Sequence, residues 1–199
     1  MIINIRATNG AGKSYIVHKI MKQYDDITEI AYLPIRNKKR PMGYICRRGT
    51  RRLFIPGHYE IDNGGIDTLD SLRFAYELIL EHHALGADVL YEGMNFSENL
   101  NFILDCHKVD LDIRVVFIRH PLSDCIKSVR KRGNAIKVET ITALFEKSNK
   151  EFVKLRVNRV KCFALDRRES FCTINNWLTE EAHVLTAGAE RLSSTVRNS

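Results

Sequence analysis

One glycine-rich stretch near the start of the chain constrains the fold more than any other feature. Residues 7–14 read ATNGAGKS, which fits the phosphate-binding pattern small-x-x-x-x-Gly-Lys-Ser, with Ala7 where Gly is more usual. An apolar, β-prone run over residues 1–5 precedes this loop, and helical spacing of apolar residues follows it over residues 15–24. In the order strand, loop and helix, successive backbone N–H groups and the positive helix end surround nucleotide phosphates. The alternative, an ordinary glycine-rich turn before a helix, is disfavoured by these flanks, so the sequence predicts a nucleotide-binding site.

Individual residues of this loop have expected roles. Gly10 and Gly12 allow the backbone to approach a phosphate closely. The Lys13 ammonium is expected to reach the β- and γ-phosphates, and the Ser14 hydroxyl is expected to ligate Mg²⁺. We therefore expect ATP and Mg²⁺ as cofactors. The residues expected to contact the nucleotide are Thr8, Asn9, Gly10, Ala11, Gly12, Lys13, Ser14 and Tyr15.

Length and composition predict one compact domain. With 199 residues, of which 44% are hydrophobic, we expect a single domain over about residues 1–180 and a C-terminal tail over 181–199. No apolar run approaches the roughly 20 residues that span a membrane, and no signal peptide precedes the first strand. The five cysteines form no C-x-x-C pair, which disfavours zinc sites and disulfides and favours the cytoplasm. The net charge of +7 indicates a polyanionic partner, although ATP alone could account for part of it.

A segment without acidic residues runs from Ile30 to Tyr59. Two short β-like runs, 42–46 and 53–56, flank a Gly-Thr turn, so we expect a basic β-hairpin, about residues 36–58, inserted after a second strand at 28–33. The hairpin is either a solvated flap or a surface for nucleic-acid phosphates, which supply most non-specific affinity. Its cations are Arg36, Lys38, Lys39, Arg40, Arg47, Arg48, Arg51 and Arg52.

A polar, glycine-rich loop follows over residues 56–68, and such loops are more typical of sites than of cores. We expect a helix from Asp67 to about Leu85, with Leu72, Tyr76 and Ile79 facing inward. Asp67 is then either the N-cap of this helix or a general base near the γ-phosphate. Asp62 and Glu60 are rivals for the role of base.

The third expected strand, residues 87–93, ends in a carboxylate. A strand-end acid beside the phosphate loop can hold Mg²⁺ directly or through water, and this predicts a metal role for Glu92. Gly93 keeps that strand end open. The alternative is a surface acid with no function.

A basic cluster follows the fourth expected strand, residues 113–118. The next helix ends in Arg130-Lys131-Arg132-Gly133, and residues 119–137 are expected to close over the transferring phosphate as a lid. Cations also gather at helix C-termini because of the helix dipole, so both interpretations stand. A long helix at 138–158, a strand at 160–165 and a last helix at 167–177 complete the chain.

This alternation predicts an α/β fold in which helices flank a parallel sheet of about five strands. The loops at the carboxyl ends of the strands carry Lys13, Asp67, Glu92 and Arg119, and such sheets bind ligands there. The chain has no Asn-Lys-x-Asp guanine signature, which disfavours a GTPase switch. The lid-like helix favours a phosphotransferase over a motor ATPase.

The phosphate loop, Glu92-Gly93 and the lid-like cluster resemble the P-loop kinase group that includes nucleotide and polynucleotide kinases, over residues 1–166. More narrowly, the segments PGHY (56–59) and GGIDT (64–68) are similar to those of small bacteriophage kinases that act on modified DNA. The resemblance implies transfer of the ATP γ-phosphate to the hydroxymethyl group of 5-hydroxymethyluracil within DNA, a step in thymine hypermodification. It also implies a location in the host cytoplasm for a phage-encoded chain.

The resemblance also implies roles for particular residues. Asp67 would be the preferred base, Glu92 would assist the metal, and Arg130 and Arg132 would stabilise transition-state charge. The hairpin, through Arg47, Arg48, Arg51 and Arg52, would grip the DNA. The target hydroxyl projects into the major groove, so flipping of the base is compatible with the reaction but not required by it. Two other classes stay open: a kinase of free nucleosides or nucleotides, and a non-catalytic, nucleotide-dependent DNA-binding module.

Overall fold

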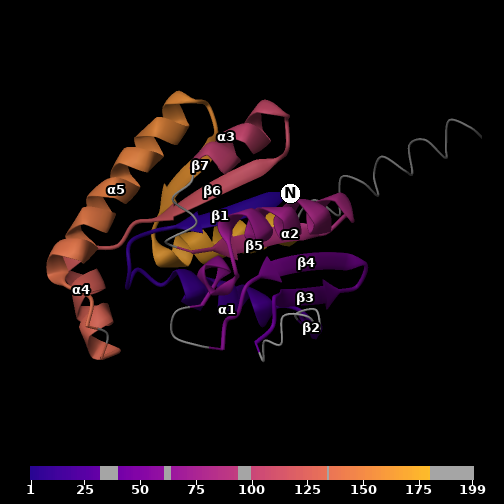
Figure 1. Ribbon diagram of the computed structural model, residues 1–199, viewed down its shortest axis with the longest axis horizontal. Helices are drawn as coiled ribbons and strands as arrows, with labels where there is room; N and C mark the ends of the chain where they lie inside the picture. The colour runs from indigo at the N-terminus through magenta and orange to yellow at the C-terminus, as the bar shows by residue number, and fades with distance from the viewer. Residues whose placement is uncertain (32–39, 61–63, 94–99, 134, 180–199) are drawn as a thin grey trace, which may run out of the picture.

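A seven-stranded sheet forms the centre of the protein (Figure 1). The computed structural model describes residues 1–31, 40–60, 64–93, 100–133 and 135–179. The strand order is β2-β3-β4-β5-β1-β6-β7. The strands are β1 (Ile2–Arg6), β2 (Asp26–Ile30), β3 (Gly43–Arg48), β4 (Arg51–Pro56), β5 (Asp88–Glu92), β6 (Ile113–Ile118) and β7 (Lys161–Leu165).

Five adjacent strands, β4, β5, β1, β6 and β7, pair in parallel, which confirms the α/β class. The sheet nevertheless has seven strands rather than about five, because the hairpin β3–β4 is part of it and not an appendage. The strand that was predicted as the second parallel strand is β2, which lies at the edge of the sheet and is antiparallel to β3. Its expected place in the parallel part of the sheet is taken by β4, the second strand of the hairpin. The physical reason is burial: residues 43–46 and 53–56 are buried on both faces, as interior strands are.

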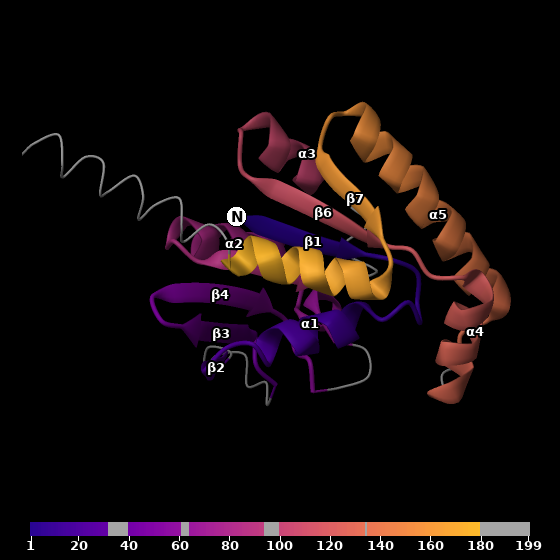
Figure 2. The ribbon, with the colours of Figure 1, turned by 180° about the vertical axis from the view of Figure 1, so that it is seen from behind.

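Helices cover both faces of the sheet. They are α1 (Lys13–Met21), α2 (Leu72–Ala84), α3 (Leu100–Lys108), α4 (Leu122–Lys131), α5 (Val138–Val157) and a C-terminal helix over residues 167–179. Because successive strand residues point to opposite faces, Ile2 belongs to one hydrophobic core and Ile3 to the other. Helices α2 and α3 cover the first core, and α1 and the C-terminal helix cover the second (Figure 2).

Helix α5 joins the two cores and is tied to the strand before the glycine loop. Ile141, near its start, lies in the second core, and Leu155, near its end, lies in the first. The Thr8 hydroxyl donates a hydrogen bond to the Ile141 carbonyl at 3.1 Å. An Arg6 guanidinium nitrogen lies 2.7 Å from the Glu151 carboxylate, with both side chains largely buried. Helix α5 is therefore anchored to β1 and its following loop at two points.

Helix α2 begins later than the sequence predicted. It starts at Leu72, and the Ser71 hydroxyl caps it by accepting a hydrogen bond from the Phe74 N–H at 3.1 Å. Its buried residues are Ala75, Leu78 and Ile79, whereas Leu72 and Tyr76 are half-buried. Of the residues expected to act, Arg36, Lys38, Lys39 and Asp62 lie outside the described residues, as does the expected tail over 181–199.

Candidate active site

The glycine loop lies between β1 and α1 and is pressed closely against two neighbouring elements. Gly12 has a φ of 94°, and a Cβ atom there would come within 2.6 Å of the Arg167 Nε. Any other residue would thus meet both left-handed strain and a side chain at the start of the C-terminal helix. Gly10 is packed as closely, since a Cβ atom there would collide with the Cys125 carbonyl in α4. In a loop of this type the backbone N–H groups and the N-terminus of the following helix bind anions.

Three side chains at the mouth of this loop contact or polarise one another. The Ser14 hydroxyl donates a hydrogen bond to the Glu92 carboxylate at 2.7 Å, and the Lys13 ammonium donates one to the Ala7 carbonyl at 3.2 Å. Burial lowers the pKa of Lys13 and raises the pKa of Glu92, and the opposite charge of each partner opposes these shifts. The loop therefore holds a buried cation next to a buried carboxylate, with a hydroxyl between the phosphate site and the acid.

Asp67 joins this group from the glycine-rich loop. It lies in a short 3₁₀ helix, Ile66–Thr68, and does not cap α2, because Ser71 does. A Cβ atom on Gly93 would lie 2.9 Å from an Asp67 carboxylate oxygen, so the glycine after Glu92 makes room for this side chain. The predicted alternative for Asp67, the N-cap of the long helix, is wrong.

The two sequence segments that carried the narrower resemblance pair with each other. The Gly65 N–H donates to the His58 carbonyl at 3.0 Å, and the His58 N–H donates to the Thr68 hydroxyl at 2.8 Å. Gly65 has a φ of 89° and packs against the Glu92 carbonyl so closely that no Cβ atom fits. These contacts hold the loop against the end of β5, so Asp67 is brought beside Glu92.

A cavity of about 1220 Å³ lies over these residues at the carboxyl edge of the sheet. On one side it is lined by the glycine loop and by Asp67 and Glu92, and on the other by Lys131 and Arg132 at the end of α4. We call it the nucleotide cleft. Its volume exceeds the range of about 300–1,000 Å³ usual for small-molecule sites, so its size does not exclude a nucleotide.

Most of the predicted loop residues line this cleft. They are Asn9, Gly10, Gly12, Lys13, Ser14 and Tyr15. Thr8 and Ala11 do not line it: the Thr8 hydroxyl is directed to α5, and Ala11 is buried with 1% of its surface exposed. In the predicted lid, Arg132 faces the cleft, whereas Arg130 is exposed and outside the lining.

Two other candidates lie away from the nucleotide cleft. Arg119 lines a different cavity, where its guanidinium carbon is 5.3 Å from the centre of the Phe152 ring. Glu60, a rival to Asp67, is exposed, and its nearest described partner is His58, at 3.5 Å. Neither side chain joins the group around Lys13.

Arg167 is a cleft residue that sequence reasoning missed. Its Nε donates to the Ala11 carbonyl at 3.2 Å, and its guanidinium lies 6.0 Å from the centre of the Tyr15 ring. The position of Arg167 in the sequence could have indicated its role, because this residue follows β7 at the carboxyl edge of a parallel sheet, where ligands bind. Local spacing indicated only that a helix starts there.

The four hairpin arginines lie at the other end of the sheet. The β3–β4 turn and helix α4 are on opposite sides of the molecule in Figure 1. Leu53 pairs with Asp88 at the start of β5, whereas Glu92 ends β5, so about 13 Å of strand separates the two levels. Arg47 pairs with Asp26 at 3.4 Å, and Arg48 donates to the Gln23 carbonyl. The predicted DNA grip is therefore not part of the nucleotide cleft.

The described part of the chain offers neither a membrane span nor a ready-made metal cluster. No helix among these residues is long and apolar enough to cross a membrane. Within residues 1–179, apart from the gaps given above, no cluster of three or more His, Cys, Asp or Glu side chains could hold a metal.

These features define a P-loop phosphotransferase. The glycine loop ends in Lys-Ser, a strand-end glutamate is hydrogen-bonded to that serine, and a basic helix faces both. The comparison of sequences gives its family. Over 132 residues the chain is 38% identical to the 5-hmdU DNA kinase of Pseudomonas phage PaMx11. These aligned residues cover 66% of this chain and 68% of that kinase. The chain belongs to the family of this kinase.

Solved structures of deoxyadenosine kinase from M. mycoides are more loosely similar. The form with dCMP and a flexible dCDP bound has a TM-score of 0.48 and 17% identity, covering 92% of this chain and 100% of that chain. The form with bound dATP has a TM-score of 0.45 and 18% identity, covering 89% and 99%. No protein-family model matches the chain.

Proposed function

We propose that this protein transfers the γ-phosphate of ATP to the hydroxymethyl group of 5-hydroxymethyluracil in DNA. The observation that carries the proposal is the 38% identity to a 5-hmdU DNA kinase over 132 residues. The geometry supports it independently, because a phosphate loop, a strand-end acid and an aspartate meet in one cleft. In the reaction the substrate oxygen forms a bond to the γ-phosphorus, the bond from that phosphorus to ADP breaks, and the hydroxyl proton leaves.

The donor phosphates belong on the glycine loop. The Lys13 ammonium contacts the Ala7 carbonyl at the start of the loop, and from there it would reach the β- and γ-phosphates of a bound nucleotide. Arg167 contacts the same loop at the Ala11 carbonyl and lies near the Tyr15 ring. We assign Arg167 to the donor nucleotide.

The Ser14 hydroxyl and the Glu92 carboxylate fit Mg²⁺. Both are hard oxygen donors, they lie 2.7 Å apart, and they adjoin the phosphate site. Mg²⁺ characteristically binds through one or two protein oxygens together with substrate phosphates and waters, so two protein donors suffice. When bound, the ion would neutralise charge that develops on the phosphates.

Asp67 is the proposed general base. Its carboxylate lines the cleft beside Glu92, yet it belongs to a different loop and is not the metal-side acid. The incoming hydroxyl would donate its proton to Asp67 as the new O–P bond forms. Gly64 lines the cleft next to it, so the acceptor would enter beside this loop.

The lid cations divide into two groups. Arg132 lines the cleft, and there its guanidinium would stabilise charge on the transferring phosphate. Arg130 is exposed on α4 outside the cleft, and we assign it to the phosphates of the DNA strand. The hairpin arginines would bind the DNA backbone farther from the reacting nucleotide.

The test incubates the protein with labelled ATP and a single 5-hydroxymethyluracil placed in an oligonucleotide, in parallel with the free nucleotide. The proposal expects label on the oligonucleotide only when the modified base is present, since the thymine control lacks the hydroxyl. Label on the free nucleotide alone would replace the proposal with a free-nucleotide kinase. Label on neither acceptor, in a folded protein that binds ATP, would support a non-catalytic module.

A further inference from the structure

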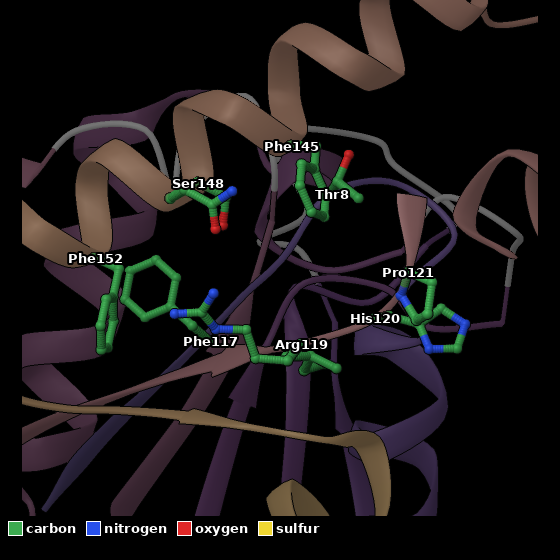
Figure 3. A pocket seen from close by; sticks show the side chains of 10 residues that line it. Thr8, Phe117, Arg119, His120, Pro121, Phe145, Ser148 and Phe152 are labelled. Carbon is green, nitrogen blue, oxygen red and sulfur yellow. The ribbon is translucent and has the colours of Figure 1, made fainter. Parts of the chain in front are cut away.

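A second cavity of about 300 Å³ lies beside the nucleotide cleft, between the end of β6 and α5 (Figure 3). Thr8 lines this cavity, whereas the next residue, Asn9, lines the cleft, so the start of the glycine loop separates the two. On α5, Leu144 lines the cleft and Ser148, about one helical turn later, lines the cavity. A ligand bound here would therefore adjoin the reacting phosphate site.

Three phenylalanine rings make up the aromatic part of the apolar lining. Phe117 comes from β6, and Phe145 and Phe152 come from α5, seven residues apart and thus on one face of the helix. Phe117 is buried and meets Phe152 edge-on, with ring centres 5.3 Å apart. Phe145 and Phe152 are only half-buried, so part of their aromatic surface is left for a flat apolar ligand to cover.

The polar part of the lining suits the edge of a nucleobase. Figure 3 shows Arg119 extended toward Phe152, and its guanidinium lies 5.3 Å from that ring centre. Ser148 and Asn149 add a hydroxyl and an amide, which together can donate and accept hydrogen bonds. None of the described residues that line the cavity is acidic, which disfavours cationic ligands and tolerates a nearby phosphate.

The size of the cavity limits the ligand. A volume of about 300 Å³ is at the lower end of small-molecule sites, which suits one ring system rather than a base pair. Proteins that read unpaired bases stack them on aromatic and arginine side chains and bond their edges with polar groups.

We propose that this aromatic cavity is a nucleobase subsite that receives an unstacked base of the acceptor DNA strand. The inference rests on the proposed function, in which the acceptor is DNA. The adenine base of ATP is the other nucleobase that could occupy this cavity. The acceptor is favoured because Arg167 and Tyr15 already offer the donor base a planar surface in the nucleotide cleft, which is a separate cavity.

The experiment measures binding separately from turnover. Fluorescence anisotropy gives the dissociation constant of a labelled single-stranded oligonucleotide with one 5-hydroxymethyluracil, for the wild type, Phe145→Leu and Asn149→Ala. Removal of base stacking or of a hydrogen bond to the base edge is expected to weaken binding about 5- to 50-fold, with the KM for ATP unchanged. Phe163→Leu is the matched control, since Phe163 is a partly exposed ring on β7 outside both cavities.

Oligonucleotides with an abasic site at the modified position, or at either neighbour, identify which base enters. If removal of one base weakens DNA binding by the wild type but not by Phe145→Leu, that base is the one that contacts Phe145. The loss of the base and the loss of the ring are then not additive, as expected for two groups in contact. Unchanged DNA affinity in both variants, or a rise confined to the KM for ATP, would overturn the acceptor subsite. Asn149→Ala keeps the test valid if thermal unfolding shows that Phe145→Leu folds poorly. Wild-type protein that binds the oligonucleotide without phosphorylating it would contradict the proposed function instead, and the comparison of affinities would still stand.

Discussion

The nucleotide cleft and the tip of the β3–β4 hairpin are both rich in cations and contain glycine, yet they are built differently. In the cleft, Lys13 is buried and polarised by Glu92 and Asp67. At the tip, Arg47 is half-exposed and its contact with Asp26 is at the surface. A buried charge needs fixed partners, whereas an exposed one is free to exchange water for a phosphate.

The difference in burial between the cleft and the tip separates two tasks, chemistry and affinity for a polyanion. Chemistry requires positioned, desolvated groups, and the carboxyl edge of the sheet supplies them. Affinity for a polyanion requires only accessible positive charge, and the opposite edge supplies that. Changes in the cleft should therefore alter turnover, and changes at the tip should alter salt-dependent affinity.

The largest expected effect is that of Lys13→Ala. It should lower turnover by on the order of 10³-fold, because it removes the buried cation that we propose to contact the β- and γ-phosphates. Circular dichroism and thermal unfolding should stay close to those of the wild type. Turnover near the wild-type value at saturating ATP would contradict this prediction. Lys13 would then contribute only to affinity, as the arginines of the hairpin tip are expected to do.

Asp67→Asn should lower turnover by about 100-fold, since an amide cannot accept the hydroxyl proton. Its stability should change little, because Asp67 is not the helix cap. Ser71→Ala is the matched control: it should cost about 1 kcal/mol of unfolding free energy and leave turnover unchanged. The reverse pattern, with Asp67→Asn unstable and active, would remove the proposed base.

Acidic pH should weaken Mg²⁺ activation if Glu92 holds the metal as proposed, because a metal ligand of this kind must be ionised. Burial raises the pKa of this carboxyl above its usual value, so the ionised form is complete only above the raised pKa and is lost as pH falls through it. Below that pKa the Mg²⁺ concentration for half-maximal activity should rise about tenfold per pH unit. Mg²⁺ titrations at several pH values test this, and a response that stays flat down to the ordinary carboxyl range would contradict it.

The smallest effect on chemistry is expected at the hairpin tip. Replacing Arg47, Arg48, Arg51 and Arg52 with glutamine should weaken DNA binding and reduce the log–log salt slope by roughly 0.7–0.9 for each phosphate that the protein no longer neutralises. Turnover at saturating DNA and the KM for ATP should be unchanged, because the tip is remote from the cleft. Parallel salt slopes for the two proteins would show that the tip is a solvated edge.

Much of this arrangement was predictable from the sequence. The glycine loop, β6 and α5 follow strong local patterns, and their observed bounds match the expected ones closely. The place of the hairpin was not predicted, because local spacing was considered, whereas strand pairing depends on burial on both faces of the sheet. The continuous apolar residues of β3 and β4 were the available signal.

The site was predictable to the extent that chemistry follows strand ends. Glu92 and Lys13 meet because β5 and β1 are adjacent and parallel. Arg167 was missed because its contact with the glycine loop joins residues 156 positions apart. Likewise, only the tertiary structure shows that Arg132 lines the cleft and that the exposed Arg130 does not.

The buried pair of Arg6 and Glu151 fixes the position of α5 on β1. Removing one partner from such a pair typically costs about 3–5 kcal/mol, so α5 does not slide along β1 there. The hydrogen bond from Thr8 to the Ile141 carbonyl holds the first turn of α5 to the glycine loop in addition. Amide exchange should therefore be slow along α5 from Ile141 to Glu151, and rapid exchange between these residues would contradict this. The strand that carries the phosphate loop thus also fixes the helix that follows the predicted lid.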